Sequence, residues 1–310
     1  MPERVSRLPE GTFSVAGERA VNRWESFKAY IEVTKPRSVF LLVFTSVVPL
    51  IIAGQGASFP WGLTLAAIMA VTLACAGANA VSCYVDRDLD AAMLRTCRRP
   101  IPSGRINPPA KALYWGFSLF AGALLLGWTL NPVACVCLCG GMLGYVGIYS
   151  LWLKRRSAWN IILGGFSGGL PALFGWTAVT GKINLLPLLI ASLVVLWIPN
   201  HIWSLAIFYR DEYARVRVPM LPVITNIRKA LHCLVLTVLL MVALSLWIGH
   251  VGNWGLVYWI TALFLGAVAV VLSVFTCLKP IPKNAWRLFK FSSPYLFLLF
   301  LGMLLDALLR

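Results

Sequence analysis

Long apolar runs alternate with short polar connections along most of this chain of 310 residues. An apolar run of about twenty residues is long enough to cross a bilayer as a helix. On this pattern we predict nine membrane-spanning helices, with ends placed to within several residues. The predicted spans are 38–53, 61–85, 112–130, 133–152, 160–178, 185–209, 231–249, 255–278 and 290–309. The pattern therefore predicts an all-α polytopic membrane protein in which residues 38–310 form one nine-helix bundle in the lipid bilayer.

The segment before the first span has a different character. Residues 1–37 are polar and mixed in charge, and they lack the apolar core of a signal peptide. Within them, Asn22 to Lys35 carries Trp24, Phe27 and Ile31 at helical spacing. We expect a short amphipathic helix on the membrane surface there.

Basic residues cluster in every second connection. The N-terminal segment and the loops 86–111, 154–159, 210–229 and 279–290 hold 25 of the 27 Lys and Arg residues. Because Lys and Arg in short loops mark the cytoplasmic side, this alternation predicts a cytoplasmic N-terminus. It places the acid-rich loops on the same side, so we expect the chemistry to face the cytoplasm.

Composition narrows the class of protein further. Hydrophobic residues make up 59% of the chain, charged residues only 12%, and mean hydropathy is +0.80. A net charge of +16 can indicate nucleic-acid binding, but basic residues that punctuate apolar spans are better explained as topology signals, so we exclude a nucleic-acid partner. Cys135, Cys137 and Cys139 alternate within one predicted helix, so they cannot all face one metal, and we expect no disulfides.

The polar stretch after the second span carries the most specific chemistry. If its helix continues through Ala92, then Asn79, Ser82, Asp86 and Asp90 lie within roughly 80° of one another on one face. Asp88 lies roughly opposite, so it is excluded from the predicted site.

Two carboxylates one helical turn apart repel each other unless a cation lies between them. Mg²⁺ takes one or two carboxylates and fills its other positions with water and phosphate oxygens. Arg95 and Arg99 could then hold a diphosphate, because a guanidinium matches phosphate oxygens in a bidentate way. The simpler alternative is a solvated, charged helix end beside a span.

Two further cytoplasmic segments have the same kind of polarity. Lys154 and Arg155 follow the fourth span, and Asp211 and Glu212 follow the sixth span. Three such segments can converge on one metal–diphosphate site if the bundle opens a cavity to the cytoplasm.

These segments together resemble the UbiA-type intramembrane prenyltransferases, and the likeness covers roughly residues 34–226. Within that family the chain is most similar to the heme O synthase branch. The matching pieces are YVDRDLDAAMLRT, YSLWLKRR, NIILGGFSGGLPALFGW, and the W-x-P-x-H-x-W-S-L-A-I run followed by DEY and VPMLPV. The family has nine transmembrane helices and two aspartate-rich cytoplasmic motifs that bind a prenyl diphosphate through magnesium.

The resemblance implies Mg²⁺-dependent transfer of a farnesyl group from farnesyl diphosphate to a vinyl group of heme B, with a downstream heme-modifying enzyme as a possible partner. Ionisation of the allylic diphosphate would rest on magnesium at Asp86 and Asp90 and on a second ion at Asp211, to which Glu212 could add a ligand, with Lys154 as a further catalytic group. Implied substrate-binding residues are Asn79, Ser82, Arg95, Arg99, Tyr149, Arg155, Asn160, His201, Trp203 and Glu212.

The chain departs from the family pattern at a few positions. Ser82 stands where an asparagine is usual, Asn200 precedes His201, and Arg217 replaces a glycine. The alternatives are therefore transfer to another aromatic or quinone-like acceptor, a prenyl-diphosphate cyclase, or a transporter. His201 lies eight residues before Tyr209, about 12 Å into the sixth span, where it would either contact the acceptor or bond to a neighbouring helix.

Overall fold

The computed structural model describes residues 23–55 and 60–309. The helices are α1 (Arg23–Val33), α2 (Pro36–Gly54), α3 (Trp61–Val85), α4 (Arg87–Ala92), α5 (Ala110–Leu130), α6 (Pro132–Met142), η1 (Leu143–Leu153), α7 (Asn160–Thr180), α8 (Leu185–Phe208), α9 (Arg210–Arg215), α10 (Leu221–Ile224), α11 (Ile227–Val251), α12 (Leu256–Leu278) and α13 (Pro282–Leu308). Nine spans of these described residues are long and apolar enough to cross a membrane, one of them α6 continued by η1. All nine predicted spans are thereby confirmed, although the last begins at Pro282 rather than near residue 290.

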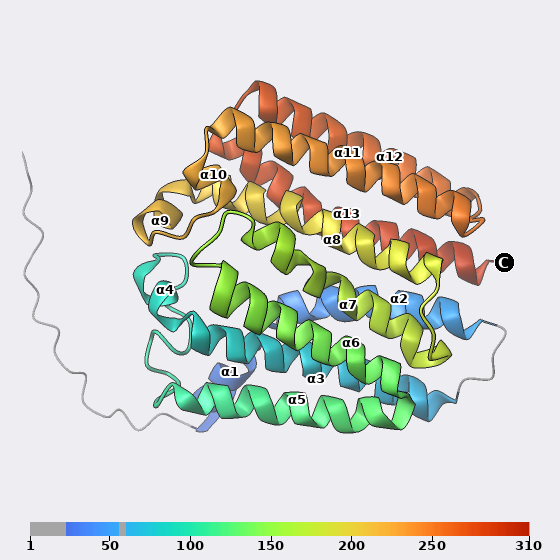
Figure 1. Cartoon of the computed structure of the whole chain (residues 1–310), viewed down its shortest axis with the longest axis horizontal. Helices are drawn as coiled ribbons and strands as arrows, with labels where there is room; N and C mark the ends of the chain where they lie inside the picture. Colours follow the sequence, from blue (N-terminus) through green and yellow to red (C-terminus); the bar gives the residue numbers. More distant parts are fainter. Residues whose placement is uncertain (1–22, 56–59, 310) are drawn as a thin grey trace, which may run out of the picture.

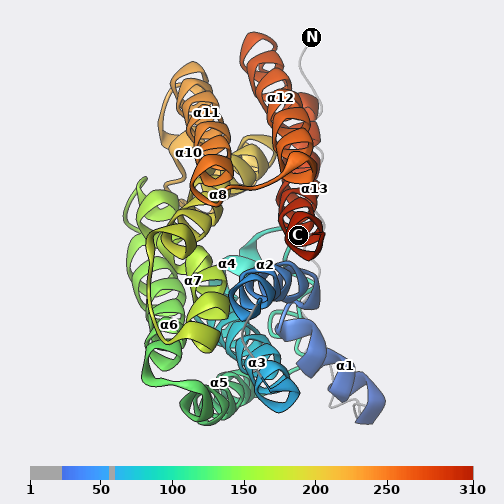
Figure 2. The ribbon, with the colours of Figure 1, turned by 90° about the vertical axis from the view of Figure 1, so that its right-hand side faces the viewer.

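The spans run alternately up and down, and the short helices gather at one end of the bundle. Figure 1 shows α4, α9 and α10 together at the left, while the C-terminus lies at the opposite end. Figure 2, which looks nearly along the helices, shows α8, α11, α12 and α13 on one side and α3, α5 and α6 on the other. The helices α2 and α7 lie between these groups and contact each other.

Each side of the bundle has its own apolar core. The larger core is built around α8, α11 and α13 and includes Leu193, Leu234 and Phe300, which are fully buried. The smaller core joins α3 to α5, α6 and α7. Small residues allow the closest approaches, as between α3 and α5, where a Cβ on Gly77 would lie 2.6 Å from the Gly116 carbonyl oxygen.

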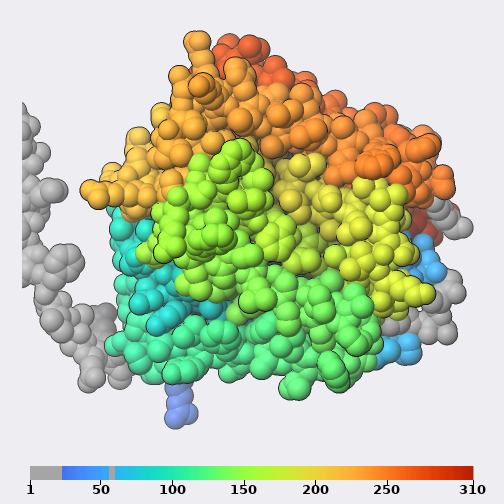
Figure 3. Space-filling model, in the orientation of Figure 1, coloured from blue at the N-terminus to red at the C-terminus, as the bar shows by residue number. Residues whose placement is uncertain are grey.

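Large apolar side chains also cover the outer surface of the spans. Leu125 on α5 is 73% exposed, Leu256 on α12 is 74% exposed and Phe264 is 67% exposed. Figure 3 shows one such face, with α5 and α11 along opposite edges and η1 with the start of α7 between them. Apolar surface of this extent suits a hydrocarbon environment, so the chain is a multi-pass integral membrane protein.

A helix is present within the segment 22–35 as α1, over Arg23–Val33, and its place on the membrane surface stays a prediction. Ala29 and Val33 are buried, while Trp24, Phe27 and Ile31 are exposed. Arg105 donates to both carboxylate oxygens of Glu32, which ties α1 to the loop after α4. The rest of the predicted N-terminal segment, residues 1–22, lies outside the described residues.

The crossing of α2 and α7 yields a first prediction. Gly175 has no room for a side chain, because a Cβ there would overlap the Ser46 carbonyl oxygen of α2. Gly175→Ala should therefore destabilise the protein by about 3 kcal/mol, at the upper end for overpacking, and lower the thermal unfolding midpoint in detergent. Gly141→Ala is the control, since nothing lies within 4 Å of a Cβ at Gly141. Equal midpoints for the two variants would contradict the described crossing.

Candidate active site

A cavity of about 460 Å³ lies inside the bundle. Its walls come from α2, α3, α4, α6, η1, α7, α8, α9 and α13, so it draws on both sides of the fold. Charged side chains of α4, of the loop after it and of the end of η1 line one part, and apolar residues such as Ala74, Leu138 and Phe174 line another. The cavity therefore combines a charged site with an apolar chamber.

Asp86 lies at the junction between two helices rather than within one helix. The shared face of Asp86 and Asp90 was predicted for a helix that continues through Ala92, whereas α3 ends at Val85, as the span 61–85 predicted. Asp86 has φ −91° and ψ 6° before α4 begins at Arg87. The Asp90 amide still donates to the Asp86 carbonyl at 2.8 Å, so the break is only one residue long. Asp86 and Asp90 both remain buried and line the cavity, although the helix between them is not continuous.

The Asp86 carboxylate has one paired and one free oxygen. Lys154 donates to Oδ2 at 2.6 Å, and the Ser82 hydroxyl lies 3.4 Å from the same oxygen. Ser82 is buried behind Asp86, where it also lies 3.2 Å from the Ser150 hydroxyl, and it does not line the cavity. The other oxygen, Oδ1, is buried without a hydrogen-bond partner in the described chain.

The Asp90 carboxylate pairs with an arginine. Arg99 Nη1 lies 2.8 Å from each Asp90 oxygen. Burial lowers the pKa of the Arg99 guanidinium, but the Asp90 carboxylate outweighs this and holds that pKa above its ordinary value. Both side chains line the cavity, so a charged pair is fixed at its wall.

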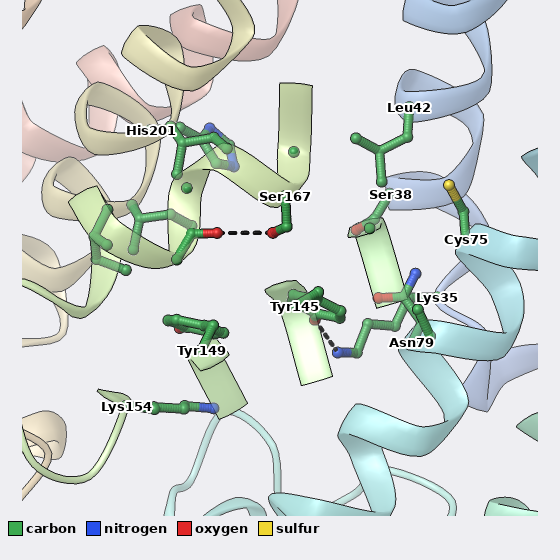
Figure 4. Close-up of a pocket in the computed structure, with 18 of the residues that line it drawn as sticks. Lys35, Ser38, Leu42, Cys75, Asn79, Tyr145, Tyr149, Lys154, Ser167 and His201 are labelled. Atoms are coloured by element: carbon green, nitrogen blue, oxygen red, sulfur yellow. Dashed lines mark hydrogen bonds between the residues drawn. The ribbon is translucent and has the colours of Figure 1, made fainter. Parts of the chain in front are cut away.

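The geometry of η1 aims three side chains into the cavity. It is a π-helix, and the Lys154 amide closes its last turn on the Tyr149 carbonyl at 2.8 Å, five residues back. At roughly 80° per residue, Tyr145, Tyr149 and Lys154 fall on one face, whereas in an α-helix Lys154 would lie opposite Tyr145. The two tyrosine rings stack at 5.9 Å, and Lys154 lies over the Tyr149 ring (Figure 4).

Lys35 is a cavity residue that the sequence analysis missed. It adopts a left-handed conformation, with φ 56°, at the N-cap of α2. Its ammonium group donates to the Tyr145 hydroxyl at 3.3 Å, and Figure 4 shows it reaching across the cavity from α2. The only local signal was a lysine directly before Pro36, where the chain must start a helix.

Arg155 does not line the cavity. It donates to both Asp88 oxygens at 2.6 Å on the exposed surface, and these hydrogen bonds lower the pKa of the Asp88 carboxyl below its ordinary value. Asp88 therefore lies outside the cavity, on the side its helical position predicted. Arg155, which the resemblance implied as a substrate-binding residue, lies outside the cavity with it.

The second acidic segment lies beside the cavity rather than in it. Asp211 on α9 is exposed, and neither Asp211 nor Glu212 lines the cavity. Glu212 accepts a long bond, 3.5 Å, from the Arg95 amide, while the Arg95 guanidinium lies over the Tyr209 ring and lines the cavity. Asp211 therefore lies outside the cavity that Asp86 and Asp90 line, and the second ion that the resemblance placed on Asp211 stays a prediction.

Three other predicted residues have different surroundings. His201 lines the cavity from α8, between the rings of Trp197 and Phe289. Trp203 is 1% exposed and Asn160, at the start of α7, is fully buried, and neither lines the cavity. Helical spacing explains why Trp203 does not reach the cavity. It follows His201 by two residues, so its side chain points about 160° away from that of His201, which lines the cavity.

The carboxylates present fit a divalent cation. Asp86 Oδ1 is a hard oxygen ligand with no other partner in the described chain. Asn79 lines the same cavity with an unpartnered amide N–H group, which suits a substrate oxygen rather than a cation. No group of three or more His, Cys, Asp or Glu side chains suited to a metal occurs among the described residues. A cation such as Mg²⁺ would thus complete its coordination with water and substrate oxygens, as that ion ordinarily does.

Known proteins share both the sequence and the fold. The UbiA prenyltransferase family matches residues 41–301. A protein of Desulforudis audaxviator named protoheme IX farnesyltransferase is 64% identical over 286 residues, which cover 92% of this chain and 90% of that protein. One of Symbiobacterium thermophilum with the same name is 39% identical and covers 90% of this chain and 93% of that protein.

Solved structures agree on the fold. A digeranylgeranylglyceryl phosphate synthase superposes with a TM-score of 0.76 at 20% identity, covering 92% of this chain and all of that one. A UbiA homolog from Archaeoglobus fulgidus bound to GPP and Mg²⁺ gives a TM-score of 0.63 at 13% identity, with coverage of 89% and 99%. Sequence and fold together show that this chain is a membrane-embedded prenyltransferase of the UbiA family.

Proposed function

We propose that this prenyltransferase transfers a farnesyl group from farnesyl diphosphate to heme B, giving heme O, with Mg²⁺ as cofactor. The observation that carries the proposal is the pair of buried carboxylates, Asp86 and Asp90, held by Lys154 and Arg99 at the wall of a largely apolar cavity. The acceptor and the prenyl group come from the relatives that are named protoheme IX farnesyltransferase.

The charged part of the cavity suits the diphosphate. Asp86, through its free Oδ1, and Asp90 would hold the cation, which when bound neutralises charge on the leaving group. Lys154 and Arg99 exchange their carboxylate partners for phosphate oxygens when substrate binds, and Arg95 lies on the same wall. Lys35 adds a fourth positive charge from the opposite wall.

The apolar part suits the prenyl chain. Allylic resonance stabilises the cation that forms when the diphosphate leaves, so the protein has to supply positioning and electrostatics rather than a nucleophile. Leu138, Pro171 and Phe174 exclude water from the chamber, and the Tyr145 and Tyr149 rings present π faces near the charged groups. The acceptor would occupy the part of the cavity lined by α8 and α13, where His201 lies.

The proposed activity has a direct test. Membranes that contain the protein are incubated with radiolabelled farnesyl diphosphate, with and without added heme B, and the products are identified by mass spectrometry. We expect label in heme, only when heme is added and only with Mg²⁺. Label in another product without heme would instead indicate a different acceptor or a cyclase, and no turnover under any condition would contradict the proposed reaction.

The acids differ in what they contribute. Asp86→Asn or Asp90→Asn removes a buried charge from the cavity wall and should lower turnover ~100-fold or more. Asp88→Asn is the matched control, because it loses only an exposed pair with Arg155, and such pairs contribute about 0–1 kcal/mol. Turnover assays on the three purified variants check this. An inactive Asp88→Asn enzyme beside an active Asp86→Asn enzyme would contradict the site.

The active-site end should face the cytoplasm. The motivating observation is that 25 of 27 basic residues lie in alternate connections. Reporter fusions placed after Arg98 and Lys229 should be active inside, and fusions after Gln55 and Gly252 outside. An outside location for Arg98 would overturn both the orientation and the access of a cytoplasmic diphosphate to the cavity.

A further inference from the structure

His201 is held more rigidly than a residue that only fills space. Its imidazole stacks on Trp197 at 4.6 Å with 20° between the ring planes, and Phe289 closes the other side at 4.5 Å. Its Nδ1 lies 2.6 Å from the hydroxyl of Ser292 on α13. The two flanking rings therefore fix the plane of the imidazole, and the hydrogen bond to Ser292 fixes the direction of its nitrogens within that plane.

The hydrogen bonds around Ser292 assign the protons. The Ser292 hydroxyl donates to the Phe289 carbonyl at 2.6 Å, three residues back on α13. A hydroxyl carries one hydrogen, so toward His201 the Ser292 oxygen acts as an acceptor, and Nδ1 must carry the proton. In a neutral imidazole the other nitrogen is then bare, so Nε2 has a free lone pair.

A second bond fixes Ser292 against α8. The Trp197 indole donates to the Ser292 backbone carbonyl at 2.7 Å. Ser292 thus receives one hydrogen bond from Trp197 and one from His201, four residues apart on one face of α8. This double link holds the register of α13 on α8, and with it the direction of the imidazole.

The other ring nitrogen of His201 has no protein partner among the described residues. His201 lines the cavity, Nδ1 is occupied by Ser292, and Nε2 makes no hydrogen bond to any described residue. Its neighbours in the cavity wall include Ile198, Ile202 and Leu205, which offer neither charge nor a proton donor. Figure 4 shows His201 on the wall opposite Lys35, away from Lys154.

We propose that His201 Nε2 is a ligand for the iron of the tetrapyrrole acceptor, and that Ser292 is a positioning residue that keeps this nitrogen deprotonated and aimed into the cavity. This inference rests on the proposed function, since it assigns an atom of the site to an iron-containing acceptor. A metal-ligating histidine ordinarily donates its other N–H to an oxygen that fixes its tautomer, and Ser292 does this here. The flanking rings of Trp197 and Phe289 add flat apolar surface on which a macrocycle edge can pack.

Binding of two porphyrins tests the proposal. Purified protein in detergent is titrated with iron protoporphyrin IX, followed by its optical and electron paramagnetic resonance spectra, and with metal-free protoporphyrin IX, followed by fluorescence. His201→Ala should lose the spectral signature of imidazole-ligated iron and weaken binding of the iron porphyrin ~100-fold or more, while the affinity for the metal-free porphyrin stays within about twofold. Added imidazole should restore the ligated spectrum.

Ser292→Ala separates positioning from folding. Loss of its hydroxyl should weaken iron-porphyrin binding ~10–100-fold and broaden the spectrum, because the ring is no longer held in one tautomer. Ser292→Thr, which keeps the hydroxyl, should retain the ligated spectrum. Ser273→Ala is the matched control, since Ser273 is also fully buried and bonds the carbonyl three residues back, and His250→Ala controls for loss of an exposed histidine.

The outcomes distinguish this inference from the proposed function. If wild-type protein binds neither porphyrin, the heme acceptor is wrong and this inference fails with it. If wild-type protein binds iron protoporphyrin but His201→Ala leaves its spectrum unchanged, the acceptor stands and the ligand assignment is overturned. Equal weakening toward the iron and metal-free porphyrins would also overturn it, because His201 would then act only as a packing residue.

Discussion

The arrangement of this protein depends on burying two carboxylates at one end of an apolar bundle. Asp86 and Asp90 are each 4% exposed, and removing an ionised carboxylate from water costs several kcal/mol unless it is paired. The partners come from other elements, Lys154 from the end of η1 and Arg99 from the loop after α4. The charges therefore fix the positions of these elements relative to α3, and the charged wall of the cavity is a consequence of that requirement.

Two local departures from the regular α-helix make these pairings possible. The break at Asp86 turns the chain so that α4 can carry Asp90 to the same cavity while Asp88 stays outside. The π-helical geometry of η1 brings Lys154 onto the face that also carries Tyr145 and Tyr149. Irregular backbone inside a membrane protein is tolerated where it lines a polar cavity, and both departures occur there.

Hydropathy was sufficient to predict the spans, because a membrane-crossing helix is defined by its own length and composition. The predicted spans 61–85 and 185–209, for example, match the bounds of α3 and α8 to within one residue. Helical spacing also separated Asp86 and Asp90 from Asp88. Which side chains pair in ion pairs and hydrogen bonds was not predictable in this way, because pairing depends on how the helices pack in three dimensions. Arg155 pairs with Asp88 rather than facing the cavity, and Ser292 reaches His201 from a helix ninety-one residues along the chain.

A cation formed at the charged wall and the imidazole of His201 would share one cavity, and the two groups could react with each other. An allylic cation reacts with any accessible lone pair, and a bare imidazole nitrogen in the same chamber would compete with the acceptor for it. His201 is bare at Nε2 because Ser292 occupies Nδ1, so the protein must keep this nitrogen from the cation. Coordination to the acceptor's iron would do so, since a lone pair shared with a metal is no longer nucleophilic. The same bond would hold the macrocycle against α8 while Lys154 and Arg99 retain the diphosphate at the charged wall, so that the allylic cation lies between its acceptor and its leaving group.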